Sequence, residues 1–371
     1  MIEFLKKYSI KIFWKILKVF LPKKSILRTF SGEFFSNSYL LKLNIRQIIW
    51  CYLNGFLPKE YFVYNLSCND YRKYLPQLNN IRKASINGQF GHVLGNKIMF
   101  ERQIKSVIEN IGHLNVIDNI GYIDDSTLKS FHKDLKTGNF NSLIDFLEKK
   151  DLILKPISGS KGSGVLLLQK KDQNYLLNNI EMNWAEIVVK LSSLNDYLIQ
   201  ERFVQVGFSH DIYPVSLNTI RICTMIDPEN NQPFIAYAIH RFGSQDSGYT
   251  DNFSTGGISA RIGLDGKLSK GKSVDKEGKI HTFEFHPLSN KRIFNEQIPA
   301  WENITWSLLE MIRRMPYLKH VGWDVIFSNG EIYILECNIG PGVNLIQIHQ
   351  PLSEITQAWK FYKVYGFIDS D

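Results

Sequence analysis

The sequence has few cysteines, and none of them are closely spaced. Its 371 residues include four, Cys51, Cys68, Cys223 and Cys337. Structural zinc sites and the disulfide frameworks of small secreted domains both need cysteines close together in the chain, so neither is expected. The expected compartment is the reducing cytoplasm.

Long hydrophobic runs are also missing. The apolar stretches are broken by charge well before the roughly 18 residues that a membrane-spanning helix needs. No small-residue cleavage site follows the N-terminal stretch, as a signal peptide would require. The sequence therefore predicts neither a spanning nor a secreted protein, and its 44% hydrophobic and 22% charged residues are typical of a globular chain.

Positive charge is plentiful but unevenly distributed. The formal net charge is +8, and residues 1–28 contain eight Lys or Arg against the single acid Glu3. The other 343 residues therefore sum to about +1. A nearly neutral body has no general need for a polyanion, so we expect no nucleic-acid partner.

Residues 1–28 are predicted to form a basic amphipathic helix that ends near Pro22. An apolar stripe recurs at helical spacing, and lysines line another face: Leu5, Tyr8, Ile12, Ile16 and Val19, with Lys7, Lys11, Lys15 and Lys18. Two interpretations are open. Residues 1–22 lie on an anionic membrane, which would make the protein peripheral on the inner leaflet, or the stripe packs on the body as an ordinary surface helix.

The rest of the chain predicts an α+β fold. Residues 30–150 read mainly as helices, including 46–53 and 101–111. From residue 152 onward short β-rich runs dominate, at 152–156, 165–169, 197–201, 219–226, 235–239, 321–327 and 331–337, with helices near 178–194 and 300–315. We expect antiparallel sheets with helices packed on them.

A glycine- and serine-rich loop joins the first two of these runs and contains Gly159, Ser160, Gly162, Ser163 and Gly164. Glycine lets backbone N–H groups converge on phosphate oxygens, although the spacing is neither that of a P-loop nor that of a dinucleotide turn. Such a hairpin alone is more often a mobile turn. Lys155 favours an anion site, because a lysine ending an apolar strand is costly without one.

Two β-rich runs near the C-terminus meet at Asn329-Gly330, a strong hairpin signal. The hairpin brings Asp324 close to Glu336, and alternation puts Glu336 and Asn338 on one face. These oxygen ligands suit Mg²⁺ bound through nucleotide phosphates. A strict two-residue turn would place Asp324 opposite Leu335, so direct pairing with Glu336 needs a three-residue connection or a one-residue bulge.

Taken in chain order, these segments resemble the ATP-grasp superfamily: Lys155 with its loop, residues 200–203, 218–221, 251–252 with 256–257, and 324–338. The residues of these motifs are most similar to those of the sugar-transfer associated ATP-grasp branch, which is related to RimK-like carboxylate–amine ligases. The resemblance covers roughly residues 95–350. It implies an ATP-grasp fold in which two α+β lobes, 96–205 and 206–371, clamp ATP and Mg²⁺, after a mostly helical region at 29–95.

The resemblance also implies roles for individual residues. Lys97, in the segment Asn96-Lys97 followed by Phe100, would contact the ATP phosphates together with Lys155. The adenine and ribose would meet Gln200, Glu201, Phe203 and Asp211; the γ-phosphate and acyl phosphate would meet Arg221, Arg241 and Asn252; and Mg²⁺ would be held by Asp324, Glu336 and Asn338. One departure is Gly322, where better-known grasp ligases often have arginine.

The implied activity joins a small-molecule carboxylate to an amine through an acyl phosphate, releasing ADP and phosphate. The branch name points to a sugar or glycan acceptor in surface polysaccharide assembly. Two alternatives stay open: a grasp kinase that phosphorylates a sugar or alcohol, and a nucleotide-binding scaffold without turnover. Retention of all three metal ligands argues against the scaffold.

Overall fold

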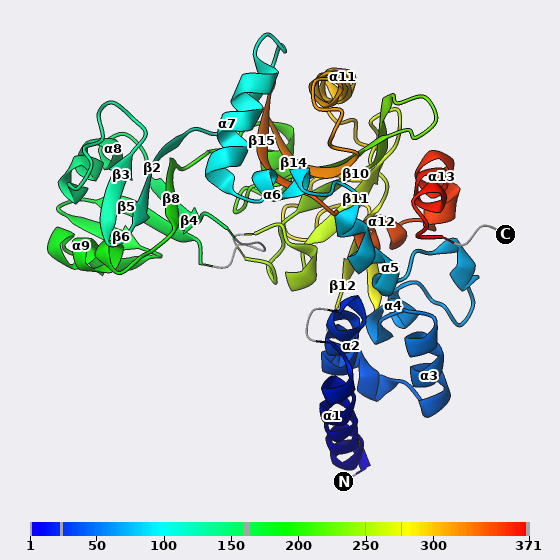
Figure 1. Ribbon diagram of the computed structural model, residues 1–371. Coiled ribbons are helices and arrows are strands. Elements are labelled where there is room, and N and C mark those ends of the chain that lie inside the picture. Colours follow the sequence, from blue (N-terminus) through cyan, green and yellow to red (C-terminus); the bar gives the residue numbers. More distant parts are fainter. Residues whose placement is uncertain (1, 23–24, 159–163, 249, 276, 369–371) are drawn as a thin grey trace.

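The computed structural model describes residues 2–22, 25–158, 164–248, 250–275 and 277–368. Two β-sheets form the body, and a group of helices projects from it at the N-terminal end (Figure 1). The N-terminal helices are α1 (Ile2–Phe20), α2 (Ile26–Ser36), α3 (Ile45–Leu53), α4 (Pro58–Val63), α5 (Gln77–Arg82) and α6 (Phe90–Leu94). We call residues 1–57, which contain α1 to α3, the limb.

The larger sheet has eight strands in the order β1-β15-β14-β9-β10-β11-β12-β13. Only the pair β1–β15 is parallel among its described pairings, whereas the sequence led us to expect antiparallel sheets. The strands are β1 (Leu114–Val116), β9 (Ile220–Ile226), β10 (Pro233–Phe242), β11 (Ile258–Ile262), β12 (Gly271–Val274), β13 (Ile280–Phe283), β14 (His320–Ser328) and β15 (Glu331–Asn338).

The smaller sheet has seven antiparallel strands in the order β3-β2-β8-β4-β5-β6-β7. Its members are β2 (Asn119–Asp124), β3 (Thr127–Ser130), β4 (Leu152–Pro156), β5 (Leu166–Lys171), β6 (Asn174–Leu177), β7 (Ile180–Met182) and β8 (Tyr197–Glu201). β4 and β8 have the predicted bounds. The reading of residues 30–150 as mainly helical was wrong at β1 to β3, because these short strands obtain their hydrogen bonds from partners far along the chain.

The remaining helices cover the sheets: α7 (Lys97–Ile108), α8 (Ile144–Leu147), α9 (Trp184–Ser192), α10 (Phe208–Ile212), α11 (Trp301–Arg313), α12 (Asn344–Gln347) and α13 (Thr356–Val364). The helix expected at 178–194 is shorter and starts after β7, because Asn183 caps it and accepts from the backbone N–H of Glu186. None of the described helices is long and apolar enough to cross a membrane.

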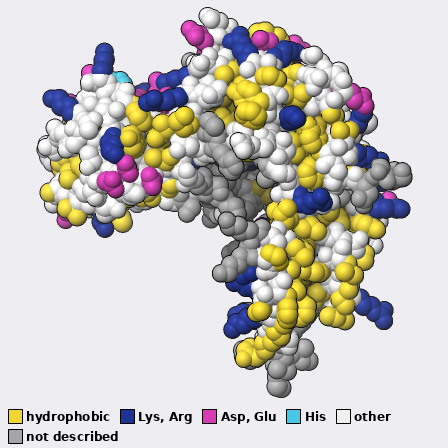
Figure 2. Space-filling view, in the orientation of Figure 1, with side chains coloured by type: hydrophobic (Ala, Val, Ile, Leu, Met, Phe, Trp, Pro, Cys, Tyr) yellow, Lys and Arg dark blue, Asp and Glu magenta, His cyan; other side chains and the backbone are white. Residues whose placement is uncertain are grey.

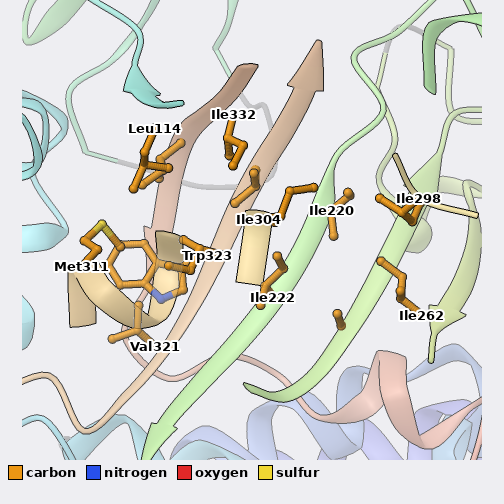
Figure 3. Packing of buried hydrophobic residues seen from close by; sticks show 14 of the residues in the cluster. Leu114, Ile220, Ile222, Ile262, Ile298, Ile304, Met311, Val321, Trp323 and Ile332 are labelled. Carbon is orange, nitrogen blue, oxygen red and sulfur yellow. The ribbon is translucent and has the colours of Figure 1, made fainter. Parts of the chain in front are cut away.

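The larger sheet is buried on both faces. On one face, Trp323 packs with Met311 and Ile304 of α11 and with Leu114 of β1 (Figure 3), and α7 joins the same core. On the other face, alternate residues of β9 and β10 pack against α12 and α13. This double burial explains why β9 and β14 read as nearly continuous hydrophobic runs. It also places α7 and β1 with the larger sheet, although the sequence boundary at residue 96 groups them with the first lobe.

Candidate active site

Strands β9, β10 and β14 place three charged side chains on one face of the larger sheet. Asp324 of β14 lies directly opposite Arg221 of β9. Arg221 in turn lies opposite Ile239 of β10, two residues before Arg241. Side chains two apart on a strand share a face, so both arginines face the same carboxylate. The hydrophobic alternation thus positions the charges without any helix or loop.

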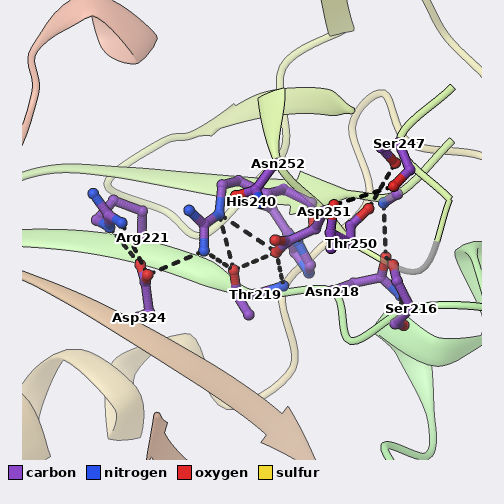
Figure 4. Close-up of polar contacts among 12 residues, drawn as sticks. Ser216, Asn218, Thr219, Arg221, His240, Ser247, Thr250, Asp251, Asn252 and Asp324 are labelled. Atoms are coloured by element: carbon purple, nitrogen blue, oxygen red, sulfur yellow. Dashed lines mark hydrogen bonds and ion pairs between the residues drawn. The ribbon is translucent and has the colours of Figure 1, made fainter. Parts of the chain in front are cut away.

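Both arginines bind Asp324. Arg221 forks onto it through Nε and Nη2, with an Nη2–Oδ2 distance of 2.9 Å, and Arg241 Nη2 lies 3.2 Å from Oδ2 (Figure 4). The Asp324 side chain is only 4% exposed. Burial opposes its ionisation, but the arginine charges outweigh that effect and hold the pKa of Asp324 well below its usual range. Asp324 is therefore a carboxylate at neutral pH.

A second acid, Asp251, fixes Arg241 from the other side. Arg241 Nε lies 3.4 Å from Asp251 Oδ2 and donates to Thr219 Oγ1 over 2.9 Å. The Thr219 backbone N–H donates to the same Asp251 oxygen over 2.9 Å, and the Thr219 hydroxyl donates to it as well. Burial raises the pKa of Asp251 despite these partners.

Thr219 and Asp251 lie in segments that the sequence analysis identified as motifs, but neither residue was predicted to belong to the site. For Thr219 the signal was present, because it stands two residues before Arg221 and must share its face. For Asp251 no local signal exists, since Thr219 lies 32 residues and Arg241 ten residues earlier in the sequence. Asn252, which follows Asp251, is the N-cap residue of a short 3₁₀ turn at Phe253–Thr255.

Asp324 also lies directly opposite Glu336 of β15. The register shifts between Asp324 and Val325, so a one-residue bulge brings the two carboxyl groups together, as one of the two sequence alternatives required. The groups are hydrogen-bonded to each other. Burial, followed by the charge of Asp324, raises the pKa of Glu336, while Lys155 and Arg221 oppose the rise.

Asn338 lies two residues beyond Glu336 and opposite Gly322. Its amide nitrogen is buried and has no hydrogen-bond partner among the described residues. A side chain at Gly322 would meet Pro341 at 2.6 Å and the Arg221 Cδ at 3.2 Å. Glycine is therefore required where the resemblance led us to look for arginine, and Arg221 occupies that space from the neighbouring strand.

Lys155 of β4, in the smaller sheet, and Lys97 of α7 both lie near Glu336. Lys97 is the first residue of α7; its Nζ donates to the Pro156 carbonyl over 3.0 Å, and its backbone N–H donates to the Ile157 carbonyl, tying α7 to the end of β4. Burial lowers the pKa of both lysines, to about 8 for Lys155, and the Glu336 charge opposes the shift in both. Lys155 of the smaller sheet and Glu336 of the larger sheet thus bring opposite charges to one place.

We call this set the charged cluster: Lys97, Lys155, Thr219, Arg221, Arg241, Asp251, Asp324 and Glu336. Other predicted residues are used differently. The Gln200 side chain donates to buried Asn119 Oδ1 over 2.6 Å, Glu201 pairs with Lys150 at the surface, and Phe203 packs on the Tyr333 ring. Asp211 is exposed on α10. Gly164 is described, at φ +76° against Pro156, whereas Gly159, Ser160, Gly162 and Ser163 lie outside the described residues.

The donor set fits a hard cation. Within the described ranges no group of three His, Cys, Asp or Glu could hold a metal ion. Asp324 supplies a carboxylate that accepts a hydrogen bond from the Glu336 carboxyl group, and the Asn338 side chain follows two residues along β15 on the same face. Mg²⁺ commonly takes one or two carboxylates from a protein and completes its shell with phosphates and water. These three residues could hold it in that way.

The profile of the sugar-transfer associated ATP-grasp family matches residues 80–358. No curated protein matches the chain significantly in sequence. Among solved structures, the chain is similar to the ADP complex of PurK, N5-carboxyaminoimidazole ribonucleotide synthetase, at 10% identity and TM-score 0.37 over 67% of this chain and 46% of that one. It is also similar to VanG D-Ala:D-Ser ligase from Enterococcus faecalis, at 13% identity and TM-score 0.37 over 72% and 62%. The chain thus spans less than two thirds of the length of either protein.

Proposed function

The chain belongs to the sugar-transfer associated ATP-grasp family, and on that premise we propose that it is an ATP-dependent carboxylate–amine ligase. A carboxylate oxygen of the substrate attacks the γ-phosphorus of ATP and ADP leaves. The amine then attacks the acyl carbon, loses a proton and expels phosphate. The observation that carries the proposal is that Lys155 of the smaller sheet lies near Glu336 of the larger sheet, with Lys97 of α7 held beside them at the end of β4.

Each part of the charged cluster has a role in this proposal. Lys97 and Lys155 contact the phosphates as compact point charges. Arg241, held between Thr219 and two carboxylates, keeps its guanidinium in place and stabilises the transferring phosphoryl group together with Arg221. Asp324, Glu336 and Asn338 would hold Mg²⁺, which would supply further neutralisation of phosphate charge. Asn252 stands near the acyl group.

The adenine would meet the backbone of residues 200–203, because the Gln200 amide and the Glu201 carboxylate are already engaged. Phe203 offers an apolar surface there. Asp211 is not part of this proposal, since it lies exposed on α10 without a contact to the charged cluster. Residues 159–164 would cover the phosphates.

A kinase is the second candidate, and one observation favours it. Asp251 is a buried acid with a raised pKa beside Asn252, and such a carboxylate can take the proton of an attacking alcohol. Against this assignment, both the Thr219 hydroxyl and Arg241 already occupy that carboxylate. The ligase therefore accounts better for the contacts.

The fate of phosphate separates the two reactions. The protein is incubated with ATP, Mg²⁺, hydroxylamine and a panel of amino acids and sugar acids. A ligase forms a hydroxamate with ADP and free phosphate, because hydroxylamine captures the acyl phosphate. A stable phosphorylated product without hydroxamate identifies a kinase instead. The control is the variant R241K. Lysine keeps the positive charge at this position but lacks the planar guanidinium group that Thr219 and Asp251 hold in place.

The acceptor is proposed to be a sugar or a glycan-linked group, in keeping with the family description. Residues 1–22 would hold the enzyme at an anionic membrane surface, where lipid-linked glycans are assembled. Support for this placement is the basic amphipathic character of α1.

A further inference from the structure

The apolar stripe of α1 faces solvent. Trp14 stacks on Phe35 at 5.6 Å between ring centroids, so α1 packs on α2 through its other side. The stripe predicted from the sequence is left uncovered: Tyr8, Ile12, Ile16 and Val19 are all exposed, Val19 by 80%. The interpretation in which this stripe packs on the body is therefore wrong for the described residues.

A second stripe of the same kind lies on α3. Ile45, Ile49 and Leu53 follow one another at four-residue spacing and are 67%, 52% and 77% exposed. The opposite face of α3 buries Cys51 in the same small core that holds Phe30 and Phe34 of α2. Hydrophobic side chains gather over α1 and α3 on the face seen in Figure 2. Single exposed apolar residues are ordinary, but a patch of this extent marks an interaction surface.

Positive charge surrounds this patch. Residues 1–57 contain ten Lys or Arg and only two acids, Glu3 and Glu33, so the limb holds the whole net charge of +8 and the rest of the chain sums to zero. Lys11, Lys15, Lys18 and Arg46 are exposed. Dark-blue side chains project from both sides of the limb in Figure 2.

We infer that α1 and α3 together form one membrane-binding face, with Ile45, Ile49 and Leu53 entering the headgroup region of an anionic bilayer beside the α1 stripe. Charge decides the occupant, because a second copy of the limb would bring +8 against +8, whereas anionic lipid complements it. No described helix is suited to cross the bilayer, so both helices lie in its plane.

The geometry of the chain agrees with such a contact. The limb projects from the body at the end that carries the N-terminus, away from the junction of the two sheets (Figure 1). Arg28 of α2 holds α1 in place by donating to the Leu21 and Lys18 carbonyls at the end of α1, and α3 shares a small core with α2. The inference rests on the proposed membrane contact of residues 1–22 and extends it to a second helix.

The test measures binding of the full chain to vesicles of phosphatidylserine and phosphatidylcholine by co-sedimentation. The triple variant I45S/I49S/L53S should bind these vesicles at least roughly tenfold more weakly than the parent chain. The matched control I180S/V189S/L264S removes three apolar side chains of the body that are 60%, 70% and 96% exposed, and it should bind as the parent does. Melting curves of both variants should match the parent, which excludes loss of fold.

The outcomes separate the two levels of the inference. If Y8S/I12S/I16S abolishes binding and I45S/I49S/L53S does not, α1 alone binds the membrane and the two-helix face is overturned. If the parent chain does not bind anionic vesicles at low salt, both the membrane contact of residues 1–22 and the two-helix face are overturned. Sedimentation velocity without vesicles tests a third outcome. If the parent chain is a dimer and I45S/I49S/L53S is a monomer, the patch is a protein–protein interface and the membrane-binding face is overturned. Point variants are preferable to deleting residues 1–22, because the deletion would uncover Phe35.

Discussion

Basic residues lie on the surface of the limb, whereas those of the charged cluster are buried against acids. In the limb, Lys11 and Lys15 are exposed beside exposed apolar side chains. In the cluster, Arg221 and Arg241 share one carboxylate that is almost fully buried. Exposed net charge therefore marks an interaction surface, whereas paired buried charges mark a functional site. Burying a charge carries a desolvation penalty that only a well-placed opposite charge offsets, while an exposed charge carries no such penalty.

The largest effect is expected where a buried charge loses its partner. In D324N Arg221 and Arg241 lose the buried carboxylate that they share, which should destabilise the fold by about 3–5 kcal/mol. ATP turnover should fall by roughly a thousandfold or more, because the arginines lose their orientation. The measurement is thermal unfolding together with ADP release. The control E229Q removes the exposed partner of Lys360 and should shift stability by less than about 0.5 kcal/mol. Equal effects of the two would contradict the comparison.

The next effect concerns ligand binding by a lysine of the cluster. K155A should weaken ATP binding by roughly tenfold to a hundredfold, because it removes a half-buried cation that faces the proposed phosphates. Calorimetric titration with ATP and Mg²⁺ measures the change. Lys150, five residues before Lys155, pairs with Glu201 at the surface, and K150A is the control. Unchanged affinity in K155A would remove this lysine from the site.

A third prediction concerns a lysine that is buried without an acid. The Lys83 Nζ has no hydrogen-bond partner in the described part of the chain and lies 5.6 Å from the Tyr362 ring centroid. Burial lowers the pKa of Lys83 from 10.5 to about 7. Between these values the unfolded chain binds the proton and the folded chain does not, so stability should rise with pH across this window.

The variant K83M tests that sign. It should be more stable than the parent near pH 7, and the rise of the parent by about 2 kcal/mol between pH 7 and pH 9 should disappear. Urea unfolding at the two pH values measures both effects. K11M, which changes an exposed lysine of the limb, should leave the pH dependence as it is. A parent whose stability falls with rising pH would contradict the assignment.

The smallest effect is expected from single charges of the limb. K11Q should weaken vesicle binding by only about fivefold, since each exposed lysine contributes about 1 kcal/mol at an anionic surface. The effect should vanish as salt shortens the Debye length below about 8 Å. Co-sedimentation at rising salt measures it. The melting temperature of the same variant should not respond, because these charges have no buried partner to leave unpaired.

Several features of the fold and site were readable from the sequence because they are local. The bounds of β4 and β8, the end of α1 before Pro22 and the hairpin that carries Asp324 and Glu336 follow from alternation, turn residues and the proline ring. The family resemblance came from the order of motifs, and the family profile covers the same region. Local patterns also identified the apolar stripe of α1, although they did not decide whether this stripe contacts a membrane or packs on the body.

Other features depended on contacts between distant residues. The sequence by itself determined which side chains share a face, since that follows from the two-residue period of a strand and the helical repeat. Only the tertiary structure decided what covers each face: the bulge that sets Asp324 opposite Glu336, the Asp251 carboxylate brought to Thr219 and Arg241, and the solvent that meets Val19 and Leu53. The physical reason is that periodicity is a property of one element, whereas burial belongs to a pair of elements that the chain brings together from any distance.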